Sequence, residues 1–224
     1  MTRIVTLRLG WSNAHLVLSE RAVLYDAGSP GDERSILPAL AAAGVRSGDL
    51  ALVILGHGHA DHAGSAAALR DATGAPVALG RADLDLVTSG SSGPLVPRGM
   101  EARLIRPFVP TRFRAFTPDL LIDDTLDLAP YGIPGTVRAL PGHTPGSLAL
   151  WLADGDVIAG DVLRGGWLGG RIGAGRSRGH YFQADESAAQ AATRTLVAVG
   201  AQRLHLGHGG PVEAAAIAAH LGGS

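Results

Sequence analysis

The chain has 224 residues, of which 46% are hydrophobic and 17% are charged, and its formal net charge at pH 7 is −1. This composition predicts a folded globule and excludes a disordered chain, and the near-neutral charge offers no basic surface for nucleic acid or an anionic membrane. The chain contains no Cys, and its nineteen basic residues are all Arg. Disulfides, thiolate ligands, a P-loop lysine and Schiff-base chemistry are therefore excluded.

Hydrophobic periodicity divides the chain into strands and helices. In chain order we expect strands at 3–8, 13–19 and 21–25, a helix at 32–43, a buried strand at 49–55, a helix at 63–72, strands at 134–140, 147–153 and 156–160, a helix at 184–198, a strand at 203–206 and a short C-terminal helix. The alternating N-terminus is typical of a strand and not of a signal peptide, and no apolar run reaches the roughly 20 residues of a membrane span. We therefore expect a cytoplasmic protein.

Strands and helices alternate twice along the chain, which predicts an α/β (α+β) fold with sheets covered by helices. No linker divides residues 1–224, so we expect a single domain. Residues 88–118 are the least regular part, with a Ser- and Gly-rich stretch followed by Arg and Phe residues. A long loop of this kind is typical of a lid over a site or of an interface, for example in a homodimer.

Four side chains with metal-binding atoms follow the apolar run 49–55. They are His57, His59, Asp61 and His62, in the pattern HxHxDH. Imidazole and carboxylate are ligands of zinc, iron and manganese. In an extended segment residues 57, 59 and 61 point the same way, whereas His62, at the start of a helix, can turn toward a neighbouring ion. The sequence therefore predicts a metal site here.

A strand end followed by Gly and a potential ligand occurs four times. The four segments are Leu55-Gly56-His57, Pro141-Gly142-His143, Ala159-Gly160-Asp161 and Leu206-Gly207-His208. A strand fixes the position of the ligand, while Gly permits a sharp turn and close backbone approach. If the strands lie side by side, all four ligands meet at one edge of the sheet layer.

These motifs resemble those of the metallo-β-lactamase-fold superfamily, and the resemblance extends from Asn13 through Tyr25-Asp26-Ala27-Gly28 to Gly207-His208-Gly209-Gly210. It implies a four-layer αβ/βα sandwich of two similar halves. It also implies two divalent metal ions, with zinc as the first expectation and iron or manganese as alternatives. The implied ligands are His57, His59 and His143 for one ion, Asp61, His62 and His208 for the other, and Asp161 bridging both. Asp26 matches a position that supports the ligand loops.

Two ions roughly 3.5–4 Å apart can share a bridging water and lower its pKa toward neutrality. We therefore expect hydrolysis by a metal-bridging hydroxide, with Asp61 as the catalytic residue that orients the water or shuttles a proton. A bridging Asp161 resembles the thioesterases of the glyoxalase II type, lactonases and phosphodiesterases. Few residues follow His208, so the additional C-terminal region of glyoxalase II proteins is not expected. A small ester, lactone or thioester is the expected substrate.

Two segments outside the predicted elements, 106–116 and 164–182, are expected to form the wall of a substrate pocket. Aromatic side chains there would hold an acyl or ring group and Arg would bind a carboxylate, whereas an interface and a solvated surface are the alternative roles. The side chains expected to reach the substrate are Phe108, Phe113, Trp167, His180 and Tyr181.

Other functions stay open at this point. A mononuclear iron enzyme resembling persulfide dioxygenases would use two His and an Asp, although residues 162–166 lack the fuller signature expected of that group. The same fold also supports β-lactamase or phosphodiesterase activity. A metal-binding or regulatory protein without turnover is the alternative outside the enzymes.

Overall fold

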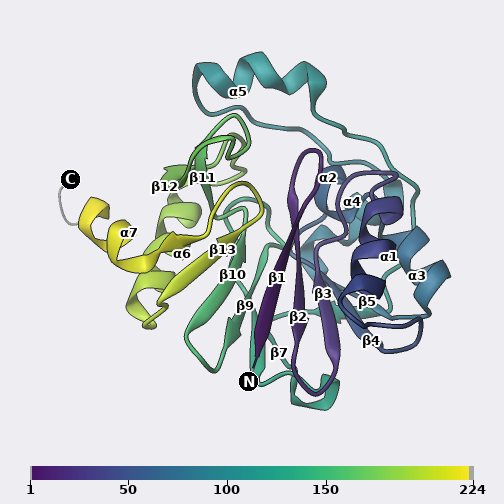
Figure 1. The fold of residues 1–224 in the computed structure, drawn as a ribbon. Helices are drawn as coiled ribbons and strands as arrows, with labels where there is room; N and C mark the ends of the chain where they lie inside the picture. Colours follow the sequence, from purple (N-terminus) through teal and green to yellow (C-terminus); the bar gives the residue numbers. More distant parts are fainter. Residues whose placement is uncertain (1, 222–224) are drawn as a thin grey trace.

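The computed structural model describes residues 2–221, which contain two six-stranded sheets and a two-stranded hairpin (Figure 1). The first sheet has the spatial order β1 (Arg3–Arg8), β2 (Asn13–Leu18), β3 (Ala22–Tyr25), β4 (Leu50–Leu55), β5 (Val77–Gly80) and β6 (Leu120–Ile122). The second has the order β14 (Val212–Glu213), β13 (Arg203–Leu206), β10 (Asp156–Gly160), β9 (Leu148–Leu152), β8 (Gly135–Ala139) and β7 (Thr125–Asp127). The hairpin consists of β11 (Leu163–Trp167) and β12 (Ile172–Gly179).

Helices lie on the outer side of each sheet. The helices are α1 (Glu33–Ala42), α2 (Ala60–Ala63), α3 (Ala66–Thr73), α4 (Leu84–Ser89), α5 (Gly99–Ile105), α6 (Glu186–Ala198) and α7 (Ala214–Leu221). Figure 1 shows α1, α3 and α4 beside the first sheet and α6 and α7 beside the second. None of the helices described between residues 2 and 221 is long and apolar enough to cross a membrane.

Alternation along the strands explains the layers, because successive side chains of a strand point to opposite faces of its sheet. On β3, Leu24 joins a buried cluster with Ile36 of α1, whereas Val23 and Tyr25 join a cluster that also holds Leu150 of the second sheet. A third cluster lies between the second sheet and helices α6 and α7. This arrangement confirms the predicted four-layer sandwich.

Parallel pairing brings several strand ends to one edge of the sandwich. Strands β3, β4, β5 and β6 are parallel neighbours, and β10 is parallel to β13. Gly160 at the end of β10 pairs with Leu206 at the end of β13. The segments that follow β4, β10 and β13 therefore start close together, as expected for ligands at the carboxyl ends of strands.

The expected elements form with ends that shift by one or two residues, except for the helix predicted at 63–72. That segment is divided between α2 and α3 by Gly64 and Ser65, and a Cβ added to Gly64 would be 2.5 Å from the backbone nitrogen of Pro30. Strands β5, β6 and β7 and helix α4 were not predicted. They are short, between three and six residues each, so their hydrophobic periodicity is weak.

Two segments expected to be irregular have regular structure. Residues 88–118 contain α5 and a 3₁₀ turn at Arg106–Phe108, and the 164–182 segment is largely the β11–β12 hairpin. The sequence of β12, IGAGRSRG, has few residues of high strand propensity, so cross-strand pairing with β11 forms this strand against its local preference.

Candidate metal centre

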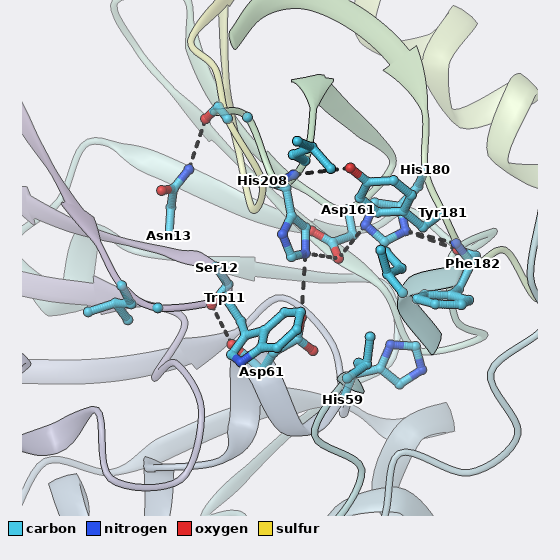
Figure 2. Close-up of a pocket in the computed structure, with 18 of the residues that line it drawn as sticks. Trp11, Ser12, Asn13, His59, Asp61, Asp161, His180, Tyr181, Phe182 and His208 are labelled. Carbon is cyan, nitrogen blue, oxygen red and sulfur yellow. Dashed lines mark hydrogen bonds and ion pairs between the residues drawn. The ribbon is translucent and has the colours of Figure 1, made fainter. Parts of the chain in front are cut away.

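All seven side chains predicted as ligands lie together in one buried cluster at the edge shared by the two sheets. Figure 2 labels His59, Asp61, Asp161 and His208 among them. His57, His59, Asp61 and His62 follow β4, while the other donors lie after β8, β10 and β13. In four groups of residues, the donor atoms lie close enough together to bind one metal ion. These groups are His57–His59–His143, His57–Asp61–His62, His62–Asp161–His208 and His143–Asp161–His180. His180 was predicted only as a pocket residue.

Three imidazoles form the first donor group. His143 Nε2 lies 3.1 Å from His57 Nε2 and 3.0 Å from His59 Nδ1. The other nitrogen of His143, Nδ1, is 2.7 Å from the carbonyl oxygen of Phe182, which can only accept a hydrogen bond. Nδ1 therefore carries the proton of a neutral His143, and Nε2 presents a lone pair to the other two rings.

The second donor group is formed by His62, His208, Asp61 and Asp161, and it combines imidazoles with carboxylates. Asp161 Oδ2 is 3.2 Å from His62 Nε2 and 3.2 Å from His208 Nε2. Asp61 Oδ2 is 3.4 Å from His208 Nε2 and 3.6 Å from His62 Nε2. The same Asp161 oxygen is 3.6 Å from His143 Nε2 and 3.9 Å from His57 Nε2, so Asp161 lies between the two groups.

The donor set fits divalent cations. Ligands about 2.1 Å from a tetrahedral ion are about 3.4 Å from one another, which is close to the spacings in both groups. His62 Nε2 and Asp161 Oδ1 are buried and have no hydrogen-bond partner among the described residues. Buried polar atoms are rarely left without a partner, and His62 Nε2 is directed at Asp161 and Asp61. Nitrogen and oxygen donors suit zinc, iron or manganese.

The pKa values of the histidines differ between the two groups in the metal-free protein. Burial, reinforced by neighbouring imidazoles, lowers the pKa of His57 and His143, and burial lowers the pKa of His59 to about 4. Burial opposes protonation of His208 too, but the Asp161 and Asp61 carboxylates outweigh it and raise its pKa to about 9. Burial also opposes protonation of His62, but the neighbouring carboxylates raise its pKa, and Asp161 contributes most among them.

Asp26 supports the loop that carries the first four donors. Its Oδ2 accepts a hydrogen bond from His62 Nδ1 at 2.8 Å, and its Oδ1 accepts one from the Gly56 amide at 2.7 Å. The first bond leaves His62 Nε2 directed at Asp161. Asp26 has a φ of 66°, a left-handed conformation that is uncommon outside Gly. These contacts agree with the supporting role that the family resemblance implied.

Asp83 is a supporting residue that sequence reasoning missed. Its Oδ2 accepts hydrogen bonds from the Gly58 amide at 2.9 Å and the Thr144 hydroxyl at 2.7 Å, and its Oδ1 accepts one from the Gly146 amide at 2.8 Å. The carboxylate thus joins the loop of His57 and His59 to the loop after His143. No motif surrounds Asp83, and only a buried position in the fold distinguishes it from other Asp residues.

Asn13 and Gly207 hold the loop that carries His208 against the N-terminal half of the protein. The Asn13 side-chain amide donates to the carbonyl oxygens of Leu206 at 2.9 Å and Gly209 at 2.8 Å. A Cβ on Gly207 would lie 2.0 Å from Asp161 Oδ1, so only Gly permits the backbone to approach this carboxylate. The close approach expected for the strand-Gly-ligand pattern is therefore observed at this position.

A cavity of about 350 Å³ opens above the donors. His59, Asp61, Asp161, His180 and His208 contribute to its floor (Figure 2). Its wall is mainly apolar and includes Trp11, Leu95, Ile105, Val109, Leu168, Tyr181 and Phe182. Residues from 88–118 and from the β11–β12 hairpin thus form the wall, as expected from the sequence, although most of the particular side chains differ.

Three of the five predicted pocket residues do not line this cavity, and for these the prediction is wrong. Phe108 is 72% exposed at the end of its 3₁₀ turn. Phe113 packs against the buried cluster beneath α1 and α3. Trp167 stacks against the Arg178 guanidinium, 3.6 Å from its ring centroid, on the hairpin. Aromatic character alone did not reveal which face each segment would present.

His180 and Tyr181 do line the cavity, but the Tyr181 hydroxyl is engaged elsewhere. It donates to Glu101 Oε1 at 2.9 Å and accepts from the Gly169 amide at 3.0 Å. Arg164 lies over the Tyr181 ring, 3.8 Å from its centroid, and contacts Glu101 Oε2 at 3.0 Å. These contacts attach α5 to the hairpin, so Tyr181 holds the wall in place.

Comparison with known proteins agrees with this geometry. The family model of the metallo-beta-lactamase superfamily matches residues 8–208, a span that includes every predicted ligand. The chain belongs to this superfamily. The match covers the strands from β2 to β13 and the loops that carry the donors.

The individual relatives of this chain are distant from it in sequence. It is 28% identical over 170 residues to the probable metallo-hydrolase YqgX of Bacillus subtilis (strain 168), covering 70% of this chain and 69% of that protein. The crystal structure of TTHA1623 in a di-iron-bound form is 26% identical, with a TM-score of 0.68 and 96% of each chain covered. The BLEG-1 B3 metallo-beta-lactamase is 23% identical, with a TM-score of 0.69 and coverage of 96% and 95%.

Proposed function

We propose that this metallo-beta-lactamase superfamily protein is a hydrolase with two divalent metal ions that cleaves a small ester, lactone or thioester. The observation that carries the proposal is the position of Asp161, whose Oδ2 lies within 3.9 Å of donor nitrogens from both groups. A carboxylate in this position is suited to bridge two ions. Such a pair supplies a water of lowered pKa and polarises the carbonyl group to be attacked.

The residues around the centre have separate tasks in this proposal. His57, His59 and His143 would hold one ion, and His62, His208 and Asp61 the other. Asp61 also lines the cavity, so its carboxylate is accessible to orient a water or to pass a proton to a leaving group. Asp26 and Asp83 hold the donor loops and do not line the cavity.

The cavity wall favours a substrate with an apolar group. Leu95, Ile105 and Val109 from residues 88–118 face Leu168 of the hairpin turn and Trp11 of the β1–β2 turn. Apolar walls around a few polar groups are typical of sites for small molecules. Arg8 and Arg171 also line the cavity, which leaves room for a polar or acidic end on the substrate.

Zinc is the metal that we propose first, with iron as the alternative. The donors are all nitrogen and oxygen, which suits both. The di-iron-bound form of TTHA1623 supports including iron in the test. The metal content of the purified protein, measured by mass spectrometry, should show two ions per chain.

Hydrolysis assays on the fully metallated protein test the proposed activity. The panel contains aryl esters, lactones, thioesters, phosphodiesters and β-lactams, with His57→Ala as the control variant. We expect turnover of an ester, lactone or thioester that the variant lacks. Equal turnover by the variant, or no turnover of any compound at full metal loading, would contradict the proposal. One iron per chain with oxygen consumption would favour the dioxygenase alternative.

A further inference from the structure

His180 lies in the metal centre although it is outside the set of seven predicted ligands. It directly follows β12, and only 5% of the residue is exposed. Its Nε2 is 3.0 Å from Asp161 Oδ2, closer than the nitrogen of any other histidine in the centre. Its ring centroid is 4.4 Å from that of His143 and 5.1 Å from that of His208. Figure 2 shows His180 beside Asp161.

The carbonyl oxygen of Phe182 orients His180 and His143 together. His180 Nδ1 is 3.1 Å from this oxygen, and His143 Nδ1 is 2.7 Å from it. The Phe182 amide also donates a hydrogen bond to His180 Nδ1 at 3.3 Å, so in the metal-free protein this nitrogen has a donor and an acceptor beside it, and the acceptor is the closer of the two. A carbonyl has two lone pairs and can accept from both rings. Both rings therefore turn Nε2 toward Asp161, as ligating histidines with an outer acceptor do.

The Nε2 atom of His180 is unpaired in this arrangement. It is buried and has no hydrogen-bond partner within residues 2–221, and Asp161 Oδ1 has none either. Asp161 Oδ2 is within ion-pair distance, but the contact lacks hydrogen-bond geometry. With the proton on Nδ1, a lone pair on Nε2 faces a carboxylate oxygen at 3.0 Å, which is unfavourable unless a cation lies between the two atoms.

We propose that His180 is an additional nitrogen ligand of the metal centre, at the edge formed by His143 and Asp161. The proposal rests on the metal site of the proposed function and not on the identity of the substrate. With His180 added to His57, His59, His143 and Asp161, the ion nearest to His143 would have more than four protein ligands. That number exceeds the four ligands typical of tetrahedral zinc sites, so for this ion the assignment favours iron, the alternative metal of the proposed function, over zinc.

Cobalt(II) binding to the metal-free full-length protein tests this assignment. The variant is His180→Asn, because an Asn amide can reach the Phe182 carbonyl but not the position of Nε2. The matched control is His205→Gln, since His205 is also buried and pairs with a carboxylate, Asp156, at 3.1 Å but lies outside the donor groups. Affinity is measured by calorimetry, and the coordination number is followed by the visible d–d absorption of cobalt.

We expect the wild-type protein and the control to bind two Co²⁺ with the same affinity and spectrum. His180→Asn should lose about tenfold or more in affinity at one site, and its d–d bands should intensify because the coordination number falls. A variant with wild-type affinity and spectrum would overturn the assignment while leaving the proposed function intact. A wild-type protein that binds no cation would overturn both.

A measurement on the wild-type protein covers the case in which the variant does not fold. In the Co²⁺-loaded protein, each coordinated imidazole keeps one ring N–H, whose proton signal is shifted by the paramagnetic ion. The donor groups contain His57, His59, His62, His143, His180 and His208. Six shifted exchangeable signals support the assignment, and the His180 signal should exchange slowly because its Nδ1 contacts the Phe182 carbonyl. Only five such signals would overturn it.

Discussion

The floor and the wall of the cavity are built in different ways. Donors on the floor follow strand ends, are buried, and are held by carboxylates and an amide that lie beneath them, namely Asp26, Asp83 and Asn13. The wall consists of α5 and the β11–β12 hairpin, where Leu168 is 51% exposed and Met100 is 68% exposed. The apolar side chains of the wall can therefore vary without removing a donor, although the Phe182 backbone also orients His143. We infer that the floor determines the type of chemistry and the wall determines which substrate reaches it.

The largest effect should come from removing the donor shared by both groups. Asp161→Ala takes away the oxygen near His57, His62, His143 and His208, so we expect both ions and all measurable turnover to be lost. The loss should exceed the ~10–100-fold effect of removing an outer supporting group. Metal content and hydrolysis rate are the measurements. Retention of two ions per chain would show that Asp161 is not the shared ligand.

Apparent metal affinity should depend steeply on pH. Below their raised pKa values, His62 and His208 carry protons that a cation must displace, so the metal-bound state holds fewer protons and is favoured as pH rises. Affinity should increase about tenfold per pH unit for each proton released, and the His208 contribution should level off above about pH 9. Competition with a chromophoric chelator between pH 6 and 8 measures this. A flat profile would contradict the charge assignment.

The Asp26→Ala variant removes a residue that supports the donor loop but leaves every proposed ligand in place. His62 loses the acceptor for Nδ1, and the Gly56 amide loses its partner. We expect metal affinity to fall by about 10–100-fold, with turnover recovering at high metal concentration. A variant that stays inactive when fully loaded would indicate that Asp26 has a more direct role.

Asp83→Ala should reduce stability more than it changes the chemistry. Two amides and the Thr144 hydroxyl would lose their buried acceptor, at about 1–3 kcal/mol each, so we expect the free energy of unfolding to fall by about 3 kcal/mol or more. Urea unfolding of the metal-free protein measures this. Asp123→Asn is the control, because that carboxylate is exposed and its ion-pair partner is the exposed Arg81. Equal effects of the two substitutions would contradict the assigned role of Asp83.

The smallest effect should come from the wall. Glu101→Gln weakens the contacts of α5 with Arg164 and Tyr181 but touches no donor. We expect KM to rise by about threefold to tenfold, with kcat and metal content unchanged, since only substrate contacts would loosen. Steady-state kinetics with the substrate found in the hydrolysis panel provide the measurement. A large fall in kcat would show that the wall also acts on the chemistry.

Sequence reasoning predicted the floor well because its signals are local. The HxHxDH run places four donors within six residues, and a Gly precedes His57, His143, Asp161 and His208 at a strand end or shortly after it. The two outer layers of helices also followed from periodicity. These features are encoded in neighbouring residues, so no tertiary contact had to be known.

The wall and the supporting contacts depend on tertiary structure and were predicted poorly. Phe113 and Phe108 belong to the same Phe-rich run, yet one packs into the core and the other faces outward. The Gly-rich β12 becomes a strand only through its pairing with β11. Asp83 acts on Gly58 and Gly146, which are distant in sequence, and His180 lies near Asp161 because β12 pairs with β11 and places Gly179 beside Leu163. None of these relations has a local sequence signal.

The contacts that connect the two halves of the protein also affect how long the protein stays folded. The donors extend from His57 to His208, and Asn13 ties the first strands to the last ligand loop. A cation held by all of these segments acts as a cross-link that closes long loops of the chain. Either half can then unfold only after the cross-link is released, so metal loss should set the unfolding rate and the lifetime under proteolysis. Addition of a chelator would then start the degradation of a protein that is otherwise kinetically trapped in its folded state.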